Sequence, residues 1–306
     1  MAAPADITDD VLDLAFREAR PMAALASAER YLIARRGGPP RVPAAVIQAL
    51  EDLAGGRPAP SPVTRAALAI ADIVERHGAA FPPGAEPAYH DRHHQAEAVL
   101  AMGWLAGAAR RLGLLSHEEA EVAVAAMAAH DLLHDGQPHA ERGLLERRSA
   151  EAAAAIAAQH GVAPEMIAAL RRTILATTWP WVESEAPDLL CRLAREADLF
   201  GSSLPTLGMR LSRLLALELA TAGQPAAETV AGHAARLALL RLLPPPTPAA
   251  RVLGLEAARA AQIAAYGATA ARLRIEPPTP DAGAAALDTM DAGDAEALLA
   301  WAGTAK

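Results

Sequence analysis

The amino-acid sequence predicts an all-α protein. Apolar residues recur at helical spacing through most of the 306 residues, and no stretch alternates apolar and polar residues as a half-buried strand does. Aromatic residues make up only 3% of the chain, so the core must be built from Leu, Ala, Ile, Val and Met, which favours close helix packing over sheet. We therefore expect one helical body of about twelve helices, a size that a chain of this length can support.

The first 80 residues predict four helices. Pro21 begins the second of them, and a short third helix is expected over 46–53. Ser61 followed by Pro62 is typical of a helix start, with an N-cap serine and proline at the first helical position. These helices carry no chemical motif, so we expect an N-terminal extension (1–80) that packs on the core. Regulation or dimerisation is the alternative role.

The rest of the chain is punctuated by Gly, Pro and capping residues. Ser116 with Glu119 three residues later predicts a capping box. The expected helices cover 91–112, 116 to about 131, 148–160, 164–177, 187–199, 205–222, 226–243 and 248–265, with a short tail helix that ends near 301. We divide the chain into the N-terminal extension, a core domain (81–275), and a Pro-rich linker with its C-terminal tail (276–306).

Composition excludes several classes of function. A net charge of −8 argues against a nucleic-acid binder, and Arg142, Arg147 and Arg148 alternate with glutamates as on a solvated helix face rather than a phosphate clamp. No apolar run approaches the ~18 residues of a membrane span, and no signal-like segment opens the chain, so we expect a cytoplasmic protein without a membrane partner. Cys191 is the single cysteine, which excludes an internal disulfide and favours a buried apolar role over a nucleophile.

Seven of the ten histidines lie between His90 and His139. His90 and His94 are four residues apart, as are His130 and His134, and on helices each pair would project from one face. Asp131 adds a carboxylate, which makes a mixed oxygen and nitrogen donor set that suits Zn, Mn, Fe or Mg. A lone histidine on an apolar helix is usually a hydrogen-bonded core residue, but this concentration favours a metal site.

Such a site indicates catalysis rather than structure. Imidazole and carboxylate ligands leave positions open for water, whereas closed structural sites usually need several cysteines and this chain has only one. A carboxylate such as that of Asp131 can bridge two cations ~3.5–4 Å apart, which lower the pKa of a shared water and neutralise a phosphoryl group. The donor set therefore favours hydrolysis of a phosphate ester or diester.

Five short segments resemble a known family. Residues 89–98, Tyr-His-Asp-Arg-His-His-Gln-Ala-Glu-Ala, are similar to the Tyr-His-Asn-x-x-His-x-x-Asp-Val signature of class I 3′,5′-cyclic nucleotide phosphodiesterases. His130-Asp131 resembles the pair that names the wider HD superfamily of metal-dependent phosphohydrolases. Further matches follow in the same order at Leu145-Glu146, at Leu175-Ala176-Thr177-Thr178 and at Ala197-Asp198-Leu199. The resemblance covers about 88–205 and implies a multi-helix HD/phosphodiesterase-like bundle around a metal site.

The resemblance also implies roles. It suggests two divalent metal ions (Zn, Mn, Mg or Fe), with Asp131 bridging them and a metal-bound hydroxide as nucleophile. The implied ligands of the tighter ion are His94, His130, Asp131 and Asp198. His90 takes the position of the general acid that protonates the departing alkoxide. His134 and Glu146 match positions that orient waters and ligands around the metals.

The chain also departs from the family pattern. Asp91 and His139 stand where the family has Asn. Glu97 and Thr178 stand where the family has Asp. The downstream Phe-x-x-Gln-Gly-Asp-like segment that fixes the purine has no counterpart, since Gln262 lacks that motif. Hydrolysis is thus better supported than specificity for cyclic nucleotides.

We therefore expect a metal-dependent phosphohydrolase, a phosphodiesterase acting on a small-molecule phosphoester or nucleotide, with cyclic nucleotides as the leading substrates. The first alternative is a di-iron HD-type oxygenase, in which His134 or His139 would contribute to a histidine-rich second metal site. The second is a non-catalytic helical binding module that retains metal. A homodimer is the assembly compatible with the N-terminal helices.

Overall fold

The computed structural model describes residues 8–56, 60–137, 139, 141–185 and 188–304, and within them every regular element is helical. The α-helices are α1 (Thr8–Phe16), α2 (Pro21–Arg36), α3 (Val42–Ala54), α4 (Pro62–Ala79), α5 (Arg92–Arg111), α6 (His117–Ala129), α7 (Leu144–Gln159), α8 (Pro164–Leu175), α9 (Leu189–Asp198), α10 (Phe200–Ser203), α11 (Pro205–Thr221), α12 (His233–Leu242), α13 (Pro248–Val252), α14 (Leu255–Arg272), α15 (Pro280–Leu287) and α16 (Ala292–Thr304). Two short 3₁₀ helices are η1 (Glu183–Glu185) and η2 (Pro225–Glu228). The all-α prediction is confirmed.

Helix starts follow the local sequence closely. The Ser61 side chain accepts a hydrogen bond from the backbone N of Thr64 at 3.0 Å, so α4 begins as expected. The expected third helix was too short, because α3 begins at Val42 instead of 46. Pro43 sits in the first turn of α3, where a missing N–H costs nothing, and α3 ends at Gly55 in the left-handed conformation.

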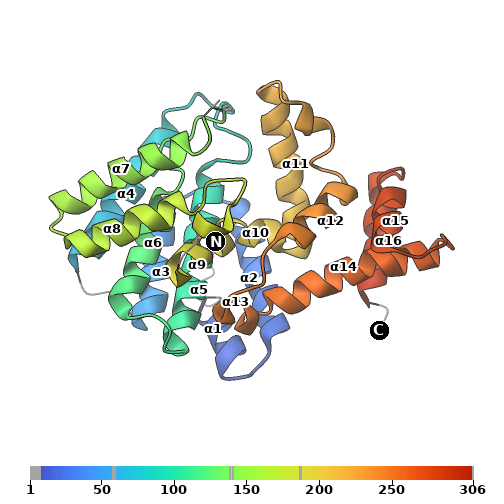
Figure 1. The fold of residues 1–306 in the computed structure, drawn as a ribbon, viewed down its shortest axis with the longest axis horizontal. Helices are drawn as coiled ribbons and strands as arrows, with labels where there is room; N and C mark the ends of the chain where they lie inside the picture. The colour runs from blue at the N-terminus through green and yellow to red at the C-terminus, as the bar shows by residue number, and fades with distance from the viewer. Residues whose placement is uncertain (1–7, 57–59, 138, 140, 186–187, 305–306) are drawn as a thin grey trace.

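Helix α5 is the centre of the packing. Its side chains are buried almost without interruption from His94 to Ala109, and it lies among α3, α6 and α9 (Figure 1). The approach of α3 to α5 is very close, since a Cβ added at Gly103 would stand 2.8 Å from the Cβ of Ala49. Small residues at this crossing let the two backbones come together, which places the first turn of α5 deep in the molecule.

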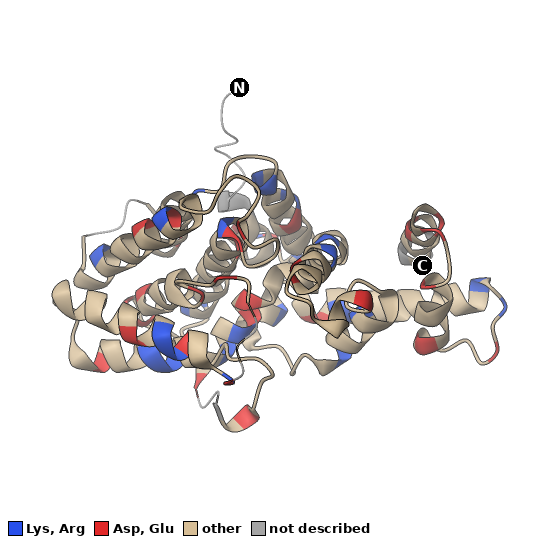
Figure 2. Cartoon of the chain, turned by 90° about the horizontal axis from the view of Figure 1, so that it is seen from above, with Lys and Arg blue, Asp and Glu red and all other residues tan. Residues whose placement is uncertain are grey.

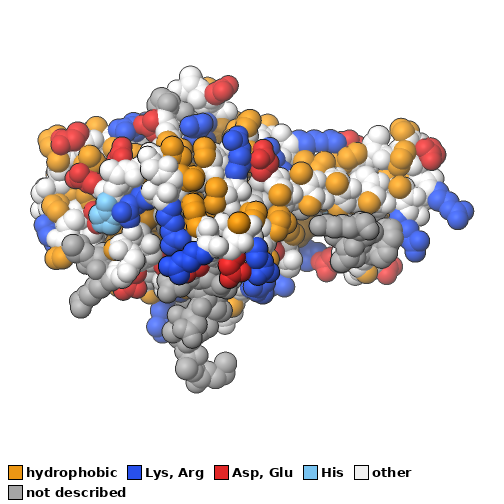
Figure 3. Space-filling view, turned by 90° about the horizontal axis from the view of Figure 1, so that it is seen from below, with side chains coloured by type: hydrophobic (Ala, Val, Ile, Leu, Met, Phe, Trp, Pro, Cys, Tyr) orange, Lys and Arg blue, Asp and Glu red, His pale blue; other side chains and the backbone are white. Residues whose placement is uncertain are grey.

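The C-terminal helices α14, α15 and α16 extend from the main body as an arm (Figure 1). A second apolar cluster holds the arm together, formed by Leu237, Leu240, Tyr266, Ala284, Leu287 and Ala295. Apolar side chains also appear along the outer surface of this part, interspersed with arginines (Figure 3).

The helices expected after residue 226 differ from those observed. Residues 226–243 form η2, a turn and the shorter α12, and residues 248–265 divide into α13 and the first part of α14. Gly254 separates those two helices with a φ of 89°, and a Cβ there would lie 2.6 Å from the carbonyl oxygen of Pro21. The tail holds two helices, α15 and α16, so the described residues contain sixteen α-helices rather than about twelve.

Charged residues of both signs are mixed along the outer helices (Figure 2). Arg147 forms an ion pair with Glu141, and Arg142 donates to the carbonyl oxygens of Thr178 and Pro180. Among the described helices, none combines the length and the apolar character needed to cross a membrane.

Candidate metal centre

His94 is placed by the start of α5. The side chain of Asp91 caps this helix and accepts a hydrogen bond from the backbone N of His94 at 2.8 Å. Asp and Asn are equally good N-caps, so the aspartate at 91 preserves the cap that an asparagine would supply. The His94 side chain is only 3% exposed and points into the molecule.

His130 and Asp131 come from the end of α6. That helix begins with the expected capping box, in which the Ser116 and Glu119 side chains each bond the other's backbone N–H. At its other end, the Gln95 side-chain amide donates to the carbonyl oxygens of Met127 and Ala128, both at 2.8 Å. These two hydrogen bonds satisfy carbonyl oxygens that have no partner within the last turn of α6, and they join α6 to α5 beside the site.

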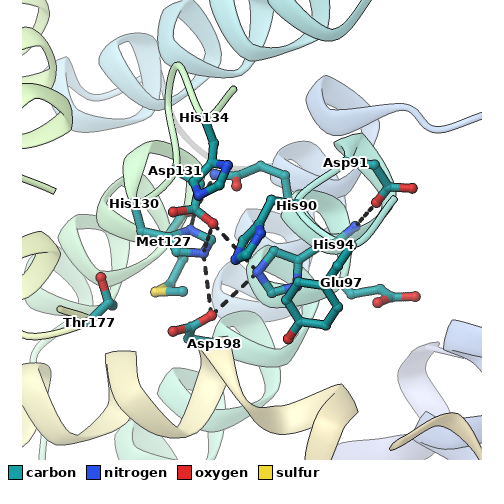
Figure 4. Close-up of polar contacts among 12 residues, drawn as sticks. His90, Asp91, His94, Glu97, Met127, His130, Asp131, His134, Thr177 and Asp198 are labelled. Carbon is teal, nitrogen blue, oxygen red and sulfur yellow. Dashed lines mark hydrogen bonds and ion pairs between the residues drawn. The ribbon is translucent and has the colours of Figure 1, made fainter. Parts of the chain in front are cut away.

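Asp198 is the last residue of α9. The Asp188 side chain caps the start of this helix, and Arg195 donates to the carbonyl oxygen of Ala176 at 2.7 Å, which fixes α9 against the end of α8. The three helices α5, α6 and α9 therefore direct four side chains toward one point (Figure 4).

The donor atoms lie at distances suited to a shared cation. Nε2 of His94 is 3.4 Å from Oδ1 of Asp198 and 3.7 Å from Oδ2 of Asp131. Nε2 of His130 is 3.3 Å from Oδ2 of Asp131 and 3.5 Å from Oδ1 of Asp198. The donor atoms of His94, His130 and Asp198 all fall within 4.8 Å of one another. Two imidazoles and two carboxylates are a donor set that Zn, Mn or Fe accepts.

Both imidazole nitrogens at this point are buried without a hydrogen-bond partner. Nε2 of His94 and Nε2 of His130 face the carboxylates, but neither makes a hydrogen bond of acceptable geometry. The other nitrogen of His130, Nδ1, lies 2.9 Å from the carbonyl oxygen of Met127, and it must carry the proton to donate there. In neutral His130 the Nε2 lone pair is thus free to bind a metal. Buried polar atoms without partners are rare, and a cation would satisfy both.

The electrostatics favour positive charge at the same point. Burial lowers the pKa of His130, but the charge of Asp131 and the contact with Asp198 outweigh burial and raise it to about 9. Burial also raises the pKa of Asp198, yet the contacts with His130 and His94 hold that pKa far below its ordinary value. The carboxylates therefore stay ionised and attract a cation, which must displace the His130 proton to bind.

His90 is held by Glu218, a residue that the sequence analysis missed. Oε1 of Glu218 lies 2.5 Å from Nδ1 of His90, while Oε2 accepts hydrogen bonds from the backbone N of Tyr89 at 2.8 Å and of His90 at 3.0 Å. Burial lowers the pKa of His90, but the bond to Glu218 and the nearby carboxylates raise it overall. The sequence signal that could have revealed Glu218 is its position as the single acid inside the leucine-rich stretch 214–219 of α11.

The two histidines of each pair do not share a helix, which agrees with the expected helix bounds of 91–112 and 116 to about 131. His90 precedes α5 and His134 follows α6, so both lie on irregular backbone. The two rings nevertheless stack, with centroids 4.0 Å apart and planes at 19°. Nδ1 of His134 accepts from the backbone N of Gly136 at 3.0 Å, and burial together with the charge of His90 lowers the pKa of His134 to about 4.

His90, His134 and Glu218 form a second group whose donor atoms lie within 4.8 Å of one another. His139 belongs to neither group, because its Nε2 faces Oδ1 of Asp135 at 3.4 Å. Glu146 is half-buried in the first turn of α7, and burial, with the charges of Asp131 and Asp198, raises its pKa.

Two other positions of the resemblance serve the fold. Glu97 accepts two hydrogen bonds from Arg36, at 2.5 and 2.9 Å, which joins α5 to α2. Thr178 is buried three residues after the end of α8. The open side of the centre is formed by His90, Asp131 and Asp198, whose side chains are 24%, 16% and 18% exposed.

Comparison with protein-family models and with curated proteins found no match. No family model matches the chain, and no curated protein does. The geometry and chemistry of the site are therefore the basis for the functional argument. What the described residues establish is a pair of buried donor groups that could hold metal.

Proposed function

We propose that this protein is a metal-dependent phosphohydrolase that cleaves a small phosphoester, with cyclic nucleotides as the first candidates. The observation that carries the proposal is the pair of buried, unpartnered Nε2 atoms of His94 and His130, which face two ionised carboxylates from separate helix ends. His94, His130, Asp131 and Asp198 would hold the cation. A divalent cation bound there supplies a Lewis acid for a phosphoryl oxygen and lowers the pKa of water.

His90 supports hydrolysis through its place beside this group. Its ring centroid lies 5.7 Å from that of His94, and its side chain is 24% exposed, so the ring is in contact with solvent. With Nδ1 bonded to Glu218, the proton on Nε2 of the imidazolium can pass to the oxygen that leaves the phosphorus. The raised pKa of His90 keeps this acid protonated at higher pH than a free histidine.

Glu218 acts as a positioning residue in this proposal. Both of its carboxylate oxygens are already engaged, one by the His90 ring and one by two backbone N–H groups. The triple contact fixes both the tautomer and the orientation of the ring, as carboxylate partners of functional histidines do.

A specific observation also favours a second candidate, a di-iron oxygenase. The donor atoms of His90, His134 and Glu218 are close enough to hold a second cation, which would be the histidine-rich site that such chemistry needs. In that case His90 would be a ligand and not an acid. The hydrogen bonds that saturate Glu218 argue for hydrolysis, because a metal at the second group would have to break them.

The test is turnover by purified protein stripped of metal and reloaded with Mn, Mg, Zn or Fe(II). The substrates are bis(p-nitrophenyl) phosphate, cyclic AMP and cyclic GMP, and metal content is measured on each sample. We expect metal-dependent hydrolysis that His130→Ala abolishes together with metal binding. His90→Ala is expected to abolish hydrolysis and keep the metal.

The alternatives predict different results. Two irons per chain and oxygen consumption, with fewer bound irons in His90→Ala, would favour the oxygenase. Bound metal without turnover of any of the three esters would leave a binding module that retains metal. Hydrolysis that persists unchanged in His130→Ala would refute the proposed centre.

A further inference from the structure

A cavity of about 600 Å³ lies apart from the metal centre, between α11, α12, α14 and α16. Pockets for small organic ligands typically have volumes of about 300–1,000 Å³. None of the residues assigned to the metal centre or to the group around His90 lines it. The cavity thus has the size of a ligand site of its own.

The cavity wall contains a buried cation, Arg236 of α12, which is only 2% exposed. Its guanidinium donates to the carbonyl oxygens of Ser202 and Leu204 and to Oε1 of Gln262, and these acceptors are all neutral. No carboxylate among the described residues forms an ion pair with it. Burial lowers the pKa of Arg236 to about 10. The charge of Glu29 acts on Arg236 without forming an ion pair with it. A buried charge without a directly paired carboxylate is costly, and an anion in the cavity would offset that cost.

The neighbouring helix makes room for this arginine. A Cβ at position 208 would overlap both the guanidinium and the carbonyl oxygen of Ser202, so only glycine fits in α11 at that point. Glycine inside a helix destabilises it relative to alanine. The close packing of Arg236 against α11 therefore requires a residue that weakens this helix.

The other charges at the cavity are also mostly positive. Arg210 and Arg213 of α11 line it, and the one acid in the lining, Glu296 of α16, forms an ion pair with Arg213 at 2.5 Å. His233 is kept neutral because burial lowers its pKa. Three arginines against one glutamate leave the wall with an excess of positive charge.

The remaining wall is aliphatic. Met209, Leu299 and the alanines of α14 line the space. Among the described lining residues, Tyr266 is the one with an aromatic side chain of the Phe, Tyr or Trp type, and its hydroxyl lies 3.4 Å from Nδ1 of His233. This lining favours a flexible hydrocarbon body over a nucleobase, which prefers an exposed aromatic face.

We propose that this cavity binds an amphipathic carboxylate with an aliphatic body. The head group pairs with Arg236 and Arg210, and the hydrocarbon lies along Met209 and Leu299. This site is independent of the metal centre and of the proposed hydrolysis.

Calorimetric titration of the full chain with decanoate tests the proposal, with decanol as the uncharged probe and AMP as the nucleotide probe. We expect one decanoate per chain and weaker binding of decanol by at least about tenfold, since one charged contact is worth about 1.4 kcal/mol or more. His130→Ala should bind decanoate as the native chain does, which separates this site from the metal centre.

Two variants at exposed positions avoid the folding risk of replacing Arg236. Ala261→Trp places a large ring into the cavity and should weaken decanoate binding by at least about tenfold. Arg213→Ala should weaken it by a smaller factor, while Arg171→Ala, which removes a similarly exposed Arg–Glu pair of α8, should not change it. The proposal would be overturned if decanol bound as well as decanoate, if AMP bound better, or if Ala261→Trp bound decanoate as the native chain does. It would also be overturned by no binding at about 1 mM decanoate, which corresponds to a binding free energy weaker than about −4 kcal/mol.

Discussion

Replacing Glu218 with alanine is expected to lower the free energy of unfolding by about 3–5 kcal/mol, the usual cost of removing one partner of a buried charged network. The side chain accepts three hydrogen bonds, from the His90 ring and from the backbone N–H groups of Tyr89 and His90. Hydrogen bonds to charged groups contribute roughly 1.5–3 kcal/mol each, and three of them in one network are not additive, so their plain sum overstates the loss.

Glu218→Gln separates the parts of this network. The amide oxygen of glutamine can still accept from the two backbone N–H groups, but its NH₂ opposes the proton on Nδ1 of His90. We expect the glutamine variant to lose only about 1–2 kcal/mol, the difference between charged and neutral acceptors. The pKa of His90 should fall, because the carboxylate that raises it is gone.

Urea unfolding measures the stability of both variants, and NMR titration of the His90 ring in Mg- or Zn-loaded protein measures its pKa. Glu228→Ala is the control, since that glutamate is exposed in η2. If both Glu218 variants matched the native chain in stability and in the titration of His90, the account of Glu218 as the residue that positions His90 would be refuted.

The remaining predictions concern the metal, pH and packing. His94→Ala and His130→Ala should each weaken Mn or Zn binding by more than ~100-fold, because even outer-shell partners cost 10–100-fold, and calorimetry with metal-free protein measures this. In metal-free protein, His130 stabilises the fold fully below about pH 6.5, and this contribution is lost as pH rises through about 9. Asp198, with its depressed pKa, contributes above about pH 4 and loses that contribution on acidification, so thermal unfolding should show a stability maximum between these limits. Gly103→Ala should destabilise by roughly 1–3 kcal/mol because its methyl group overlaps Ala49, and an unchanged urea midpoint would contradict the close crossing of α3 and α5.

The ends of helices explain why much of the candidate centre could be anticipated from sequence. Ser116 and Glu119 define the start of α6 through local hydrogen bonds, and the composition of the following residues carries the helix to His130. Histidine and aspartate at such an end are recognisable donors, and the structure brings His130 and Asp131 to His94. Local chemistry and short motifs were sufficient for these residues.

Long-range pairing explains what could not be anticipated. Glu218 meets His90 across 128 residues, and Arg36 meets Glu97 across 61, so no local pattern marks either partner. The expected helix across residue 254 failed for a related reason. A glycine within an apolar periodic stretch is compatible with a helix, and only the approach of α2 requires the left-handed turn at Gly254.

Helix α11 follows the last proposed metal ligand in the sequence, and this order affects what substitutions in α11 can do. All four donors of the centre lie between His94 and Asp198, whereas Glu218, which orients His90, comes from a helix that begins at Pro205. In the proposed mechanism, the metal ligands and the carboxylate that orients His90 thus come from separate stretches of polypeptide, although His90 itself lies next to His94 in sequence. If the proposed hydrolysis is correct, a single replacement at Glu218 is expected to impair it while leaving all four proposed metal ligands in place, which would turn the chain into a metal-binding protein without turnover.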